Sequence, residues 1–123
     1  MTKSQAVLKQ LIEALQRLKE ALDAPHNDLQ RDASIQRFEF TLDLSWKVIK
    51  VYLEEKKGLM CHSPKDCFRL AYREGLIEYS DEWLKFVDLR NETSHTYNQE
   101  LAKKIYQQLP IFAKYIEQLL KKI

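Results

Sequence analysis

The stretch DLQRDASIQRFEFTLDLSWKVIKVYLEEKK, residues 28–57, decides the fold because it carries two apolar faces at helical spacing. The first face repeats at intervals of three and four residues and contains Ile35, Phe38, Leu42, Trp46, Ile49 and Leu53. The opposite face contains Phe40, Leu44, Val48 and Val51. Since a surface helix needs only one apolar face, the second must pack on another helix or on another copy of the chain.

A polar ridge runs between the two apolar faces of this helix and contains Glu39 and Asp43. These two carboxylates are one helical turn apart, but no histidine or cysteine joins them at the spacing of metal ligands. We therefore interpret the ridge as a solvated face and expect no metal site there. The alternative is that one of the carboxylates orients Arg90.

Three helices are predicted in the first part of the chain. Periodic leucines indicate a helix over about residues 4–23, and Gly58 is placed to end the helix over residues 28–57. A third, short helix starts after Ser63, where a serine, a proline and an acidic residue follow the order preferred at helix starts. This helix is expected to end near Gly75.

Two further helices complete the chain. One opens at Ser80 with acidic residues in its first turn and continues to Arg90. The last starts near Asn98, and its apolar residues keep one angular phase across Pro110, which predicts one helix kinked at the proline. The sequence therefore predicts an all-α fold.

Composition limits the classes to which the protein can belong. The length of 123 residues, with 45% hydrophobic residues, predicts one domain over residues 1–123. Two glycines and three prolines argue against a turn-rich all-β fold. The net charge of +2 by itself implies neither a nucleic-acid binder nor a membrane-surface protein. No apolar run approaches the roughly 20 residues that span a bilayer and no signal peptide is evident, so we expect a cytoplasmic protein without membrane contact.

Cysteine and lysine residues give two local signals. Cys61 and Cys67 are too few for a disulfide framework and lack CxxC spacing, so we expect two reduced thiols. Lys103, Lys114 and Lys121 lie within about 20° of one another on the last helix. We interpret this stripe as a solvated face, with contact to nucleic acid as the alternative.

The polar stretch LRNETSHTYN, residues 89–98, concentrates the groups that could do chemistry. Arg90 offers a fork of donors for phosphate oxygens, and His95 can move a proton near neutral pH. On one continuous helix these two side chains would lie about 140° apart, so they converge only if the helix ends or bends between them. Tyr97 shares the side of His95 if the chain there is extended. From spacing alone, the alternative is a helix cap and a surface side chain.

The pattern Arg90-Asn91-x3-His95-x-Tyr97 resembles the R-x4-H-x-Y signature of HEPN (higher eukaryotes and prokaryotes nucleotide-binding) domains. The stretch RFEFTLDLSWK, residues 37–47, is similar to the second helix of the branch called nucleotidyltransferase substrate-binding proteins. The resemblance covers nearly the whole chain. It implies an all-α, up-and-down antiparallel bundle of four to five helices that forms a homodimer. It also implies assembly with a minimal nucleotidyltransferase encoded beside it.

The resemblance assigns roles to the motif residues. In related HEPN proteins the arginine and the histidine form a ribonuclease site that needs no metal or other cofactor, and these modules behave as toxins. In at least one group the nucleotidyltransferase is the antitoxin and transfers AMP to the motif tyrosine. These roles fall on Arg90, His95 and Tyr97, with Asn91 shaping the turn and all four available to bind a nucleotide or RNA. Two functions follow: a binding and regulatory subunit, or an endoribonuclease.

A second copy of the chain would complete a ribonuclease site. Cleavage through the 2′-hydroxyl needs a base, an acid and a cation, but one chain offers a single motif histidine. A two-fold dimer would bring two copies of Arg90 and His95 into one cleft. The second apolar face of the helix over residues 28–57 is the predicted interface, and its alternative is packing beneath the last helix. The predicted interface residues are Phe40, Leu44, Val48 and Val51.

Overall fold

The computed structural model describes residues 1–78 and 80–123, and over these residues it contains helices and loops but no strand. Five α-helices and one short 3₁₀ turn follow one another along the chain. They are α1 (Lys3–Asp23), α2 (Asp28–Lys57), α3 (Pro64–Arg73), α4 (Ser80–Glu92), η1 (Thr93–His95) and α5 (Gln99–Lys122). The predicted all-α class is confirmed.

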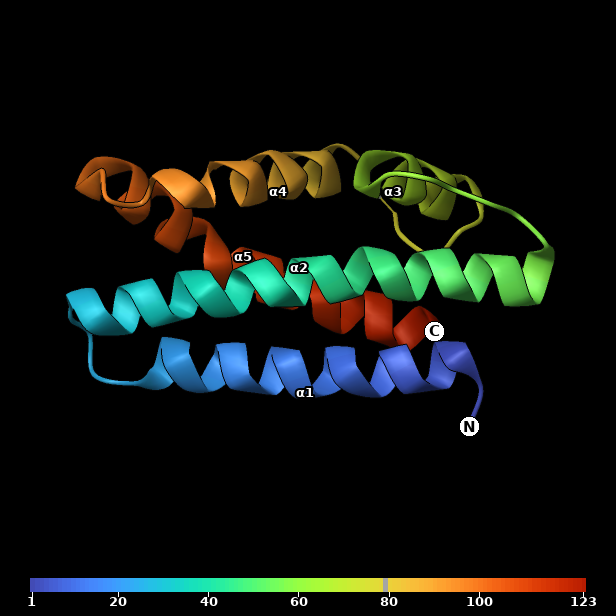
Figure 1. Cartoon of the computed structure of the whole chain (residues 1–123), viewed down its shortest axis with the longest axis horizontal. Coiled ribbons are helices and arrows are strands. Elements are labelled where there is room, and N and C mark those ends of the chain that lie inside the picture. Colours follow the sequence, from blue (N-terminus) through green and yellow to red (C-terminus); the bar gives the residue numbers. More distant parts are fainter. Residues whose placement is uncertain (79) are drawn as a thin grey trace.

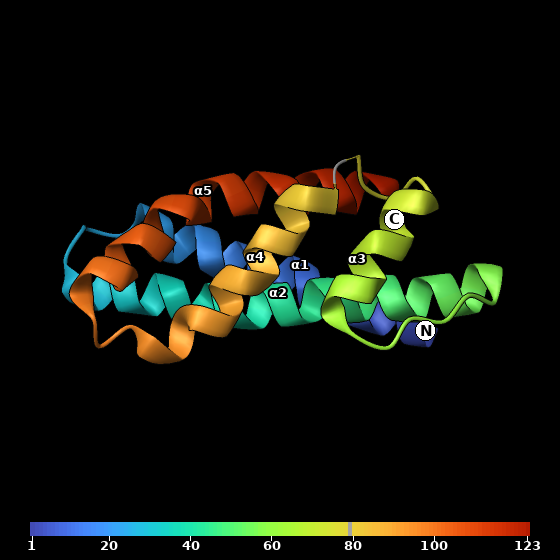
Figure 2. The ribbon, with the colours of Figure 1, turned by 90° about the horizontal axis from the view of Figure 1, so that it is seen from above.

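α1, α2, α4 and α5 run in alternating directions, with α2 at the centre of the bundle, whereas the short α3 lies crosswise to α2 (Figures 1 and 2). α1 packs along one side of α2, while α3 and α4 follow each other along the opposite side. α5 runs back behind α2 and contacts both α1 and α2. Seen from above, α4 and α5 are joined at one end of the molecule by the turn that contains η1 (Figure 2). The motif residues therefore lie at one end of the bundle.

An aromatic cluster forms the centre of the core. Trp83 on α4 stacks on Phe68 of α3, with ring centroids 4.7 Å apart, and Phe112 on α5 meets Phe38 of α2 edge-on at 4.8 Å. Phe86 contacts Phe112 at 5.2 Å. These five rings are almost completely buried. They hold α2, α3, α4 and α5 together because offset and edge-on aromatic pairs add to the free energy gained by burial.

Local sequence signals fix the helix ends. The side chain of Asn27 accepts a hydrogen bond from the backbone of α2 in its first turn, and Gly58 ends α2 in the left-handed conformation with φ of 66°. Ser63 caps α3 in the same way as Asn27 caps α2, with a proline in the first turn. These are the boundaries that the residue types predict, because serine and asparagine satisfy free N–H groups and glycine adopts positive φ without strain.

α5 is a single helix that continues through Pro110. The ring of Pro110 is exposed, and its missing N–H leaves the carbonyl of Tyr106 without its helical partner. The prediction of one helix across the proline is confirmed, and the kink stays a prediction. Within the described part of the chain, no helix is long and apolar enough to cross a bilayer.

The expectation of two reduced cysteines is wrong, because Cys61 and Cys67 form a disulfide. Cys67 lies in α3, and Cys61 lies in the loop that leads into it. The loop turns back at the start of α3 and brings the two Cα atoms to 5.1 Å, within the range that a disulfide can bridge. Both side chains are buried in the core. A separation of six residues gave no indication of this approach, which depends on the path of the loop.

The predicted dimer interface on α2 needs one correction. Val48 is completely buried within the single chain, so it cannot contact a second copy. Because α2 is surrounded by α1, α3, α4 and α5, the chain itself covers this part of the second apolar face. Phe40, Leu44 and Val51 are half-buried. The Arg17 guanidinium lies over the Phe40 ring, 5.4 Å from its centroid.

Candidate functional site

The helix break between the motif arginine and histidine is formed by α4 and η1. α4 ends at Glu92, and the chain then tightens into the 3₁₀ turn Thr93–His95. The Thr93 hydroxyl donates a 2.7 Å hydrogen bond to the carbonyl of Arg90. Asn98 then caps α5 by accepting hydrogen bonds from two backbone N–H groups of its first turn. Arg90 and His95 therefore do not lie on one continuous α-helix, which is the condition that the sequence analysis set for their convergence.

Arg90 is held by acidic side chains from α2. Its Nε and Nη2 atoms donate to the two carboxylate oxygens of Asp43 at 3.2 and 3.1 Å, which is a bidentate pair. Its Nη1 atom donates to Thr93 Oγ1 at 3.1 Å and lies 3.3 Å from the Glu39 carboxylate. The hydrogen bonds that Arg90 donates to Asp43 are the largest cause of the raised pKa of Arg90, and partial burial opposes this shift.

These contacts assign a role to the polar ridge. Glu39 and Asp43 are half-buried rather than fully solvated, so the first interpretation of the ridge is wrong at these two positions. The alternative, that a carboxylate orients Arg90, is what the structure shows. The pairing is bidentate because both carboxylate oxygens match the planar fork of the guanidinium.

The contacts of Arg90 limit what it can bind in this conformation. A guanidinium has five N–H groups, of which Asp43 and Thr93 take three. Two carboxylates beside one cation also leave the immediate surroundings negative. The two remaining N–H groups lie on Nη1 and Nη2, and the Glu39 carboxylate, 3.3 Å from Nη1, disfavours the approach of a phosphate to them. In the structure as it stands, Arg90 joins α4 to α2 and fixes the position of the turn.

His95 and Tyr97 lie on the solvent side of this turn. Both side chains are exposed, and that of Tyr97 is exposed to 83%. The Tyr97 hydroxyl lies 3.5 Å from His95 Nδ1, and the two rings meet edge-on with centroids 6.0 Å apart. Tyr97 therefore lies on the side of His95, although the chain here forms a 3₁₀ turn and is not extended, as the prediction required. Among the described residues, no hydrogen bond or ion pair joins this pair to Arg90.

Asn91 lies in the last turn of α4, and its side chain is exposed. The side chains that hold the turn are those of Thr93, which is buried, and Asn98. From the sequence, Thr93 is suited to a helix exit and Asn98 lies near the start of the last helix, but the capping role of Asn98 was not predicted. Asn98 carried a usable signal, because asparagine directly before a helix is a preferred N-cap.

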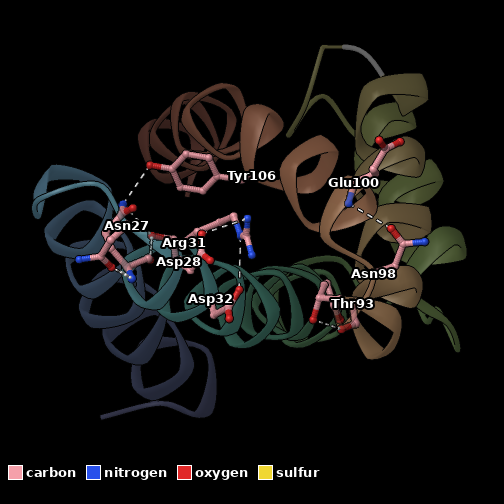
Figure 3. A network of polar contacts seen from close by, with 11 residues as sticks. Asn27, Asp28, Arg31, Asp32, Thr93, Asn98, Glu100 and Tyr106 are labelled. Carbon is pink, nitrogen blue, oxygen red and sulfur yellow. Dashed lines mark hydrogen bonds and ion pairs between the residues drawn. The ribbon is translucent and has the colours of Figure 1, made fainter.

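Further polar contacts surround the start of α2 and the first turns of α5 (Figure 3). Arg31, which is buried, lies between the carboxylates of Asp28 and Asp32 at 3.6 and 3.4 Å. The Gln30 amide donates to the Tyr106 hydroxyl of α5 at 2.9 Å. The hydrogen bond between Gln30 and Tyr106 ties α2 to α5 through side chains that the sequence analysis did not identify.

Residues 93–98, which join α4 to α5, form the motif turn. The fold and the motif turn together define a HEPN-like helical domain. Residues 5–123 match the family described as "Nucleotidyltransferase substrate binding protein like", and the chain belongs to this family. The match covers α1 from its third residue onward, the helices α2 to α5 and the turn between α4 and α5.

Two solved structures and one curated protein are similar to this chain. A crystal structure of a protein from Thermus thermophilus is 44% identical, with a TM-score of 0.85 over 90% of this chain and 96% of that one. A protein from Haemophilus influenzae, described as having the fold of a substrate-binding domain of a nucleotidyltransferase, is 32% identical. Its TM-score is 0.82 over 93% of this chain and 96% of that one. The "Probable ribonuclease HepT" of Haemophilus influenzae is 40% identical over 83 residues, which are 64% of this chain and 57% of that protein.

Proposed function

We propose that this protein is a nucleotide- or nucleic-acid-binding subunit that assembles with a minimal nucleotidyltransferase, as the toxin half of a cytoplasmic toxin–antitoxin pair. The observation that carries the proposal is the exposed Tyr97 hydroxyl beside His95 at one end of the bundle. A tyrosine that is 83% exposed and held next to a base is accessible to the active site of a second protein. The family to which the chain belongs supports such a partner.

The geometry supports a transfer of AMP from ATP to Tyr97. In this step the phenol oxygen of Tyr97 bonds to the α-phosphorus, and the bond from that phosphorus to pyrophosphate breaks. The phenol proton goes to His95 Nδ1, which lies 3.5 Å away and can act as the general base. Arg90, held by Asp43, keeps the turn in place without contacting the nucleotide.

A second candidate function is that of a metal-independent endoribonuclease. It is favoured because the motif is intact and its histidine, His95, is exposed. Here His95 takes the proton of the RNA 2′-hydroxyl, and the partner subunit's His95 in a homodimer protonates the leaving oxygen. Arg90 would stabilise the charged transition state through the two N–H groups that Asp43 and Thr93 leave free. Transfer of AMP to Tyr97 would block this site and thereby regulate it. The curated relative described as a probable ribonuclease supports this candidate.

The proposed homodimer uses the half-buried residues of the second apolar face of α2, without Val48. They are Phe40, Leu44 and Val51. Leu44→Asp should convert the dimer to a monomer, because burying the new charge in an interface is unfavourable. Light scattering should then give the mass of one chain. Ile12→Asp is the matched control, since Ile12 is exposed on α1. A folded Leu44→Asp protein that remains dimeric would exclude this interface.

The AMP-transfer proposal is tested by intact mass. The protein is incubated with the nucleotidyltransferase encoded beside it and ATP, and we expect it to gain the mass of AMP. Tyr97→Phe should abolish the gain, whereas Tyr72→Phe, at a half-exposed tyrosine on α3, should leave it unchanged. His95→Ala should slow the transfer because the base is lost. Modification of the Tyr97→Phe protein would rule out Tyr97 as the acceptor.

The two candidate functions are separated by RNA cleavage in the presence of a chelator. Unmodified protein that cleaves RNA, with the cleavage lost in His95→Ala, would establish the ribonuclease. Growth inhibition in cells should then be lost in the same variant. A correctly folded protein of unmodified mass that does not cleave RNA would leave the binding subunit as the function.

A further inference from the structure

A cavity of about 390 Å³ lies away from the motif turn, between the C-terminal half of α5 and the segment that joins α3 to α4. This volume lies within the range of small-molecule sites. Its apolar surface comes from Ile77 beside α4 and from Ile111 and Tyr115 on α5, with the buried Trp83 also lining it. Ile111 is 44% exposed, so part of this apolar surface faces solvent.

Lysine side chains surround the cavity on the α5 side. Lys114, Lys121 and Lys122 line it and are exposed, and none forms an ion pair with another described residue. Lys114 and Lys121 lie on the same side of α5, two turns or about 10 Å apart. The cavity lining includes one carboxylate, that of Glu78. Positive charge therefore exceeds negative charge around an apolar cavity.

This combination defines the chemistry of a ligand. Several lysines can approach a doubly charged phosphate group from different sides, whereas the planar fork of an arginine favours a bidentate partner. The apolar surface matches a ligand whose remaining part is apolar, because burial of that part is favourable and a hydroxylated body would find few hydrogen-bonding partners. Among the lining residues, Gln118 offers an amide and Glu78 a carboxylate that could accept a hydrogen bond from a hydroxyl.

We propose that this cavity binds a small organic phosphate with an apolar body, with its phosphate at Lys114 and Lys121 and its body against Ile111 and Tyr115. The site shares no residue with the motif turn. The proposal therefore goes beyond the proposed function, and failure of either one leaves the other standing.

The test is a titration of the isotope-labelled full chain with 1-naphthyl phosphate, followed by NMR. We expect a dissociation constant on the order of a millimolar or tighter, as for a ligand of this size, with shifts at residues 76–78 and 111–122. Lys114→Gln combined with Lys121→Gln should weaken binding at least about tenfold, because two charge-assisted contacts are lost. Ile111→Asn should weaken it as well.

Lys103→Gln is the matched control, since Lys103 is exposed on the same side of α5 but does not line the cavity. The proposal is overturned if Lys103→Gln weakens binding as much as the double variant, or if oligouridine binds more tightly through the same lysines. Either result would mean that the lysines of α5 bind polyanions in general and do not form a site for a small phosphate. Equal affinity for inorganic phosphate, or for 1-naphthol, would also overturn it, because either would mean that only one half of the site is used.

Discussion

The bidentate pair between Arg90 and Asp43 should couple α4 to α2 by a measurable free energy. A hydrogen bond to a charged group contributes about 1.5–3 kcal/mol to stability, whereas a fully exposed ion pair contributes about 0.2–1 kcal/mol. The two side chains are 32% and 41% exposed, so solvent screening places this pair between those limits. We therefore expect a coupling energy of about 1.5 kcal/mol, which corresponds to a fall of about 5 °C in Tm for a domain of this size.

A double-mutant cycle with Asp43→Ala and Arg90→Ala measures this energy by urea unfolding. Arg90→Ala should cost more than Asp43→Ala, because it leaves Asp43 and Glu39 without the cation between them. Adding Glu39→Gln to Arg90→Ala should recover part of the loss. A coupling energy within about 0.3 kcal/mol of zero would mean that the two mutations are additive, and it would refute the bidentate pair of Arg90 and Asp43 as a stabilising contact.

Three further predictions concern stability. The pKa of Glu55 is lowered below 4.5, mainly because its carboxylate accepts a hydrogen bond from the Ser4 hydroxyl. The ionised Glu55 therefore stabilises the fold above pH 4.5, and this stabilisation is lost as the pH falls through the lowered pKa. Glu55→Gln should therefore reduce the loss of stability between pH 6 and about pH 3 in urea unfolding, and an unchanged pH profile would contradict this. Alanine at both Cys61 and Cys67 should lower the free energy of unfolding by about 2 kcal/mol, as expected for a closed loop of about six residues, and a reductant should then have no further effect on Tm. Phe112→Ala should lower the free energy of unfolding, measured by chemical denaturation, by about 3–5 kcal/mol because loss of the ring leaves a cavity. A loss under about 1 kcal/mol would mean that neighbouring side chains move in to fill the space of the ring.

Much of the fold was predictable because its boundaries depend on local chemistry. The helix expected over residues 28–57 is α2, since the cap before it and Gly58 after it act within one turn. The start of α3 at Ser63 was predictable for the same reason. One helix across Pro110 followed from the continuous phase of its apolar residues.

Contacts between distant residues were less accessible from the sequence. Asp43 and Arg90 are 47 residues apart, so their pairing depends on how α4 packs on α2. The solvated interpretation of the ridge failed there because helical periodicity says which residues share a face but not what covers it. Val48 was misassigned for the same reason, since the chain itself covers it. The disulfide depends on a loop for which periodicity carries no information.

The central position of α2 has a consequence for local opening of the bundle. α2 contacts α1, α3, α4 and α5, so no other helix can separate from the bundle without breaking contacts with it. Amide protons in the middle of α2, around Leu42 and Ile49, should therefore exchange with solvent only when the whole domain unfolds. The exposed motif turn after α4 should exchange earlier through small local openings. The chain thus joins a slowly exchanging scaffold to a turn that exchanges faster.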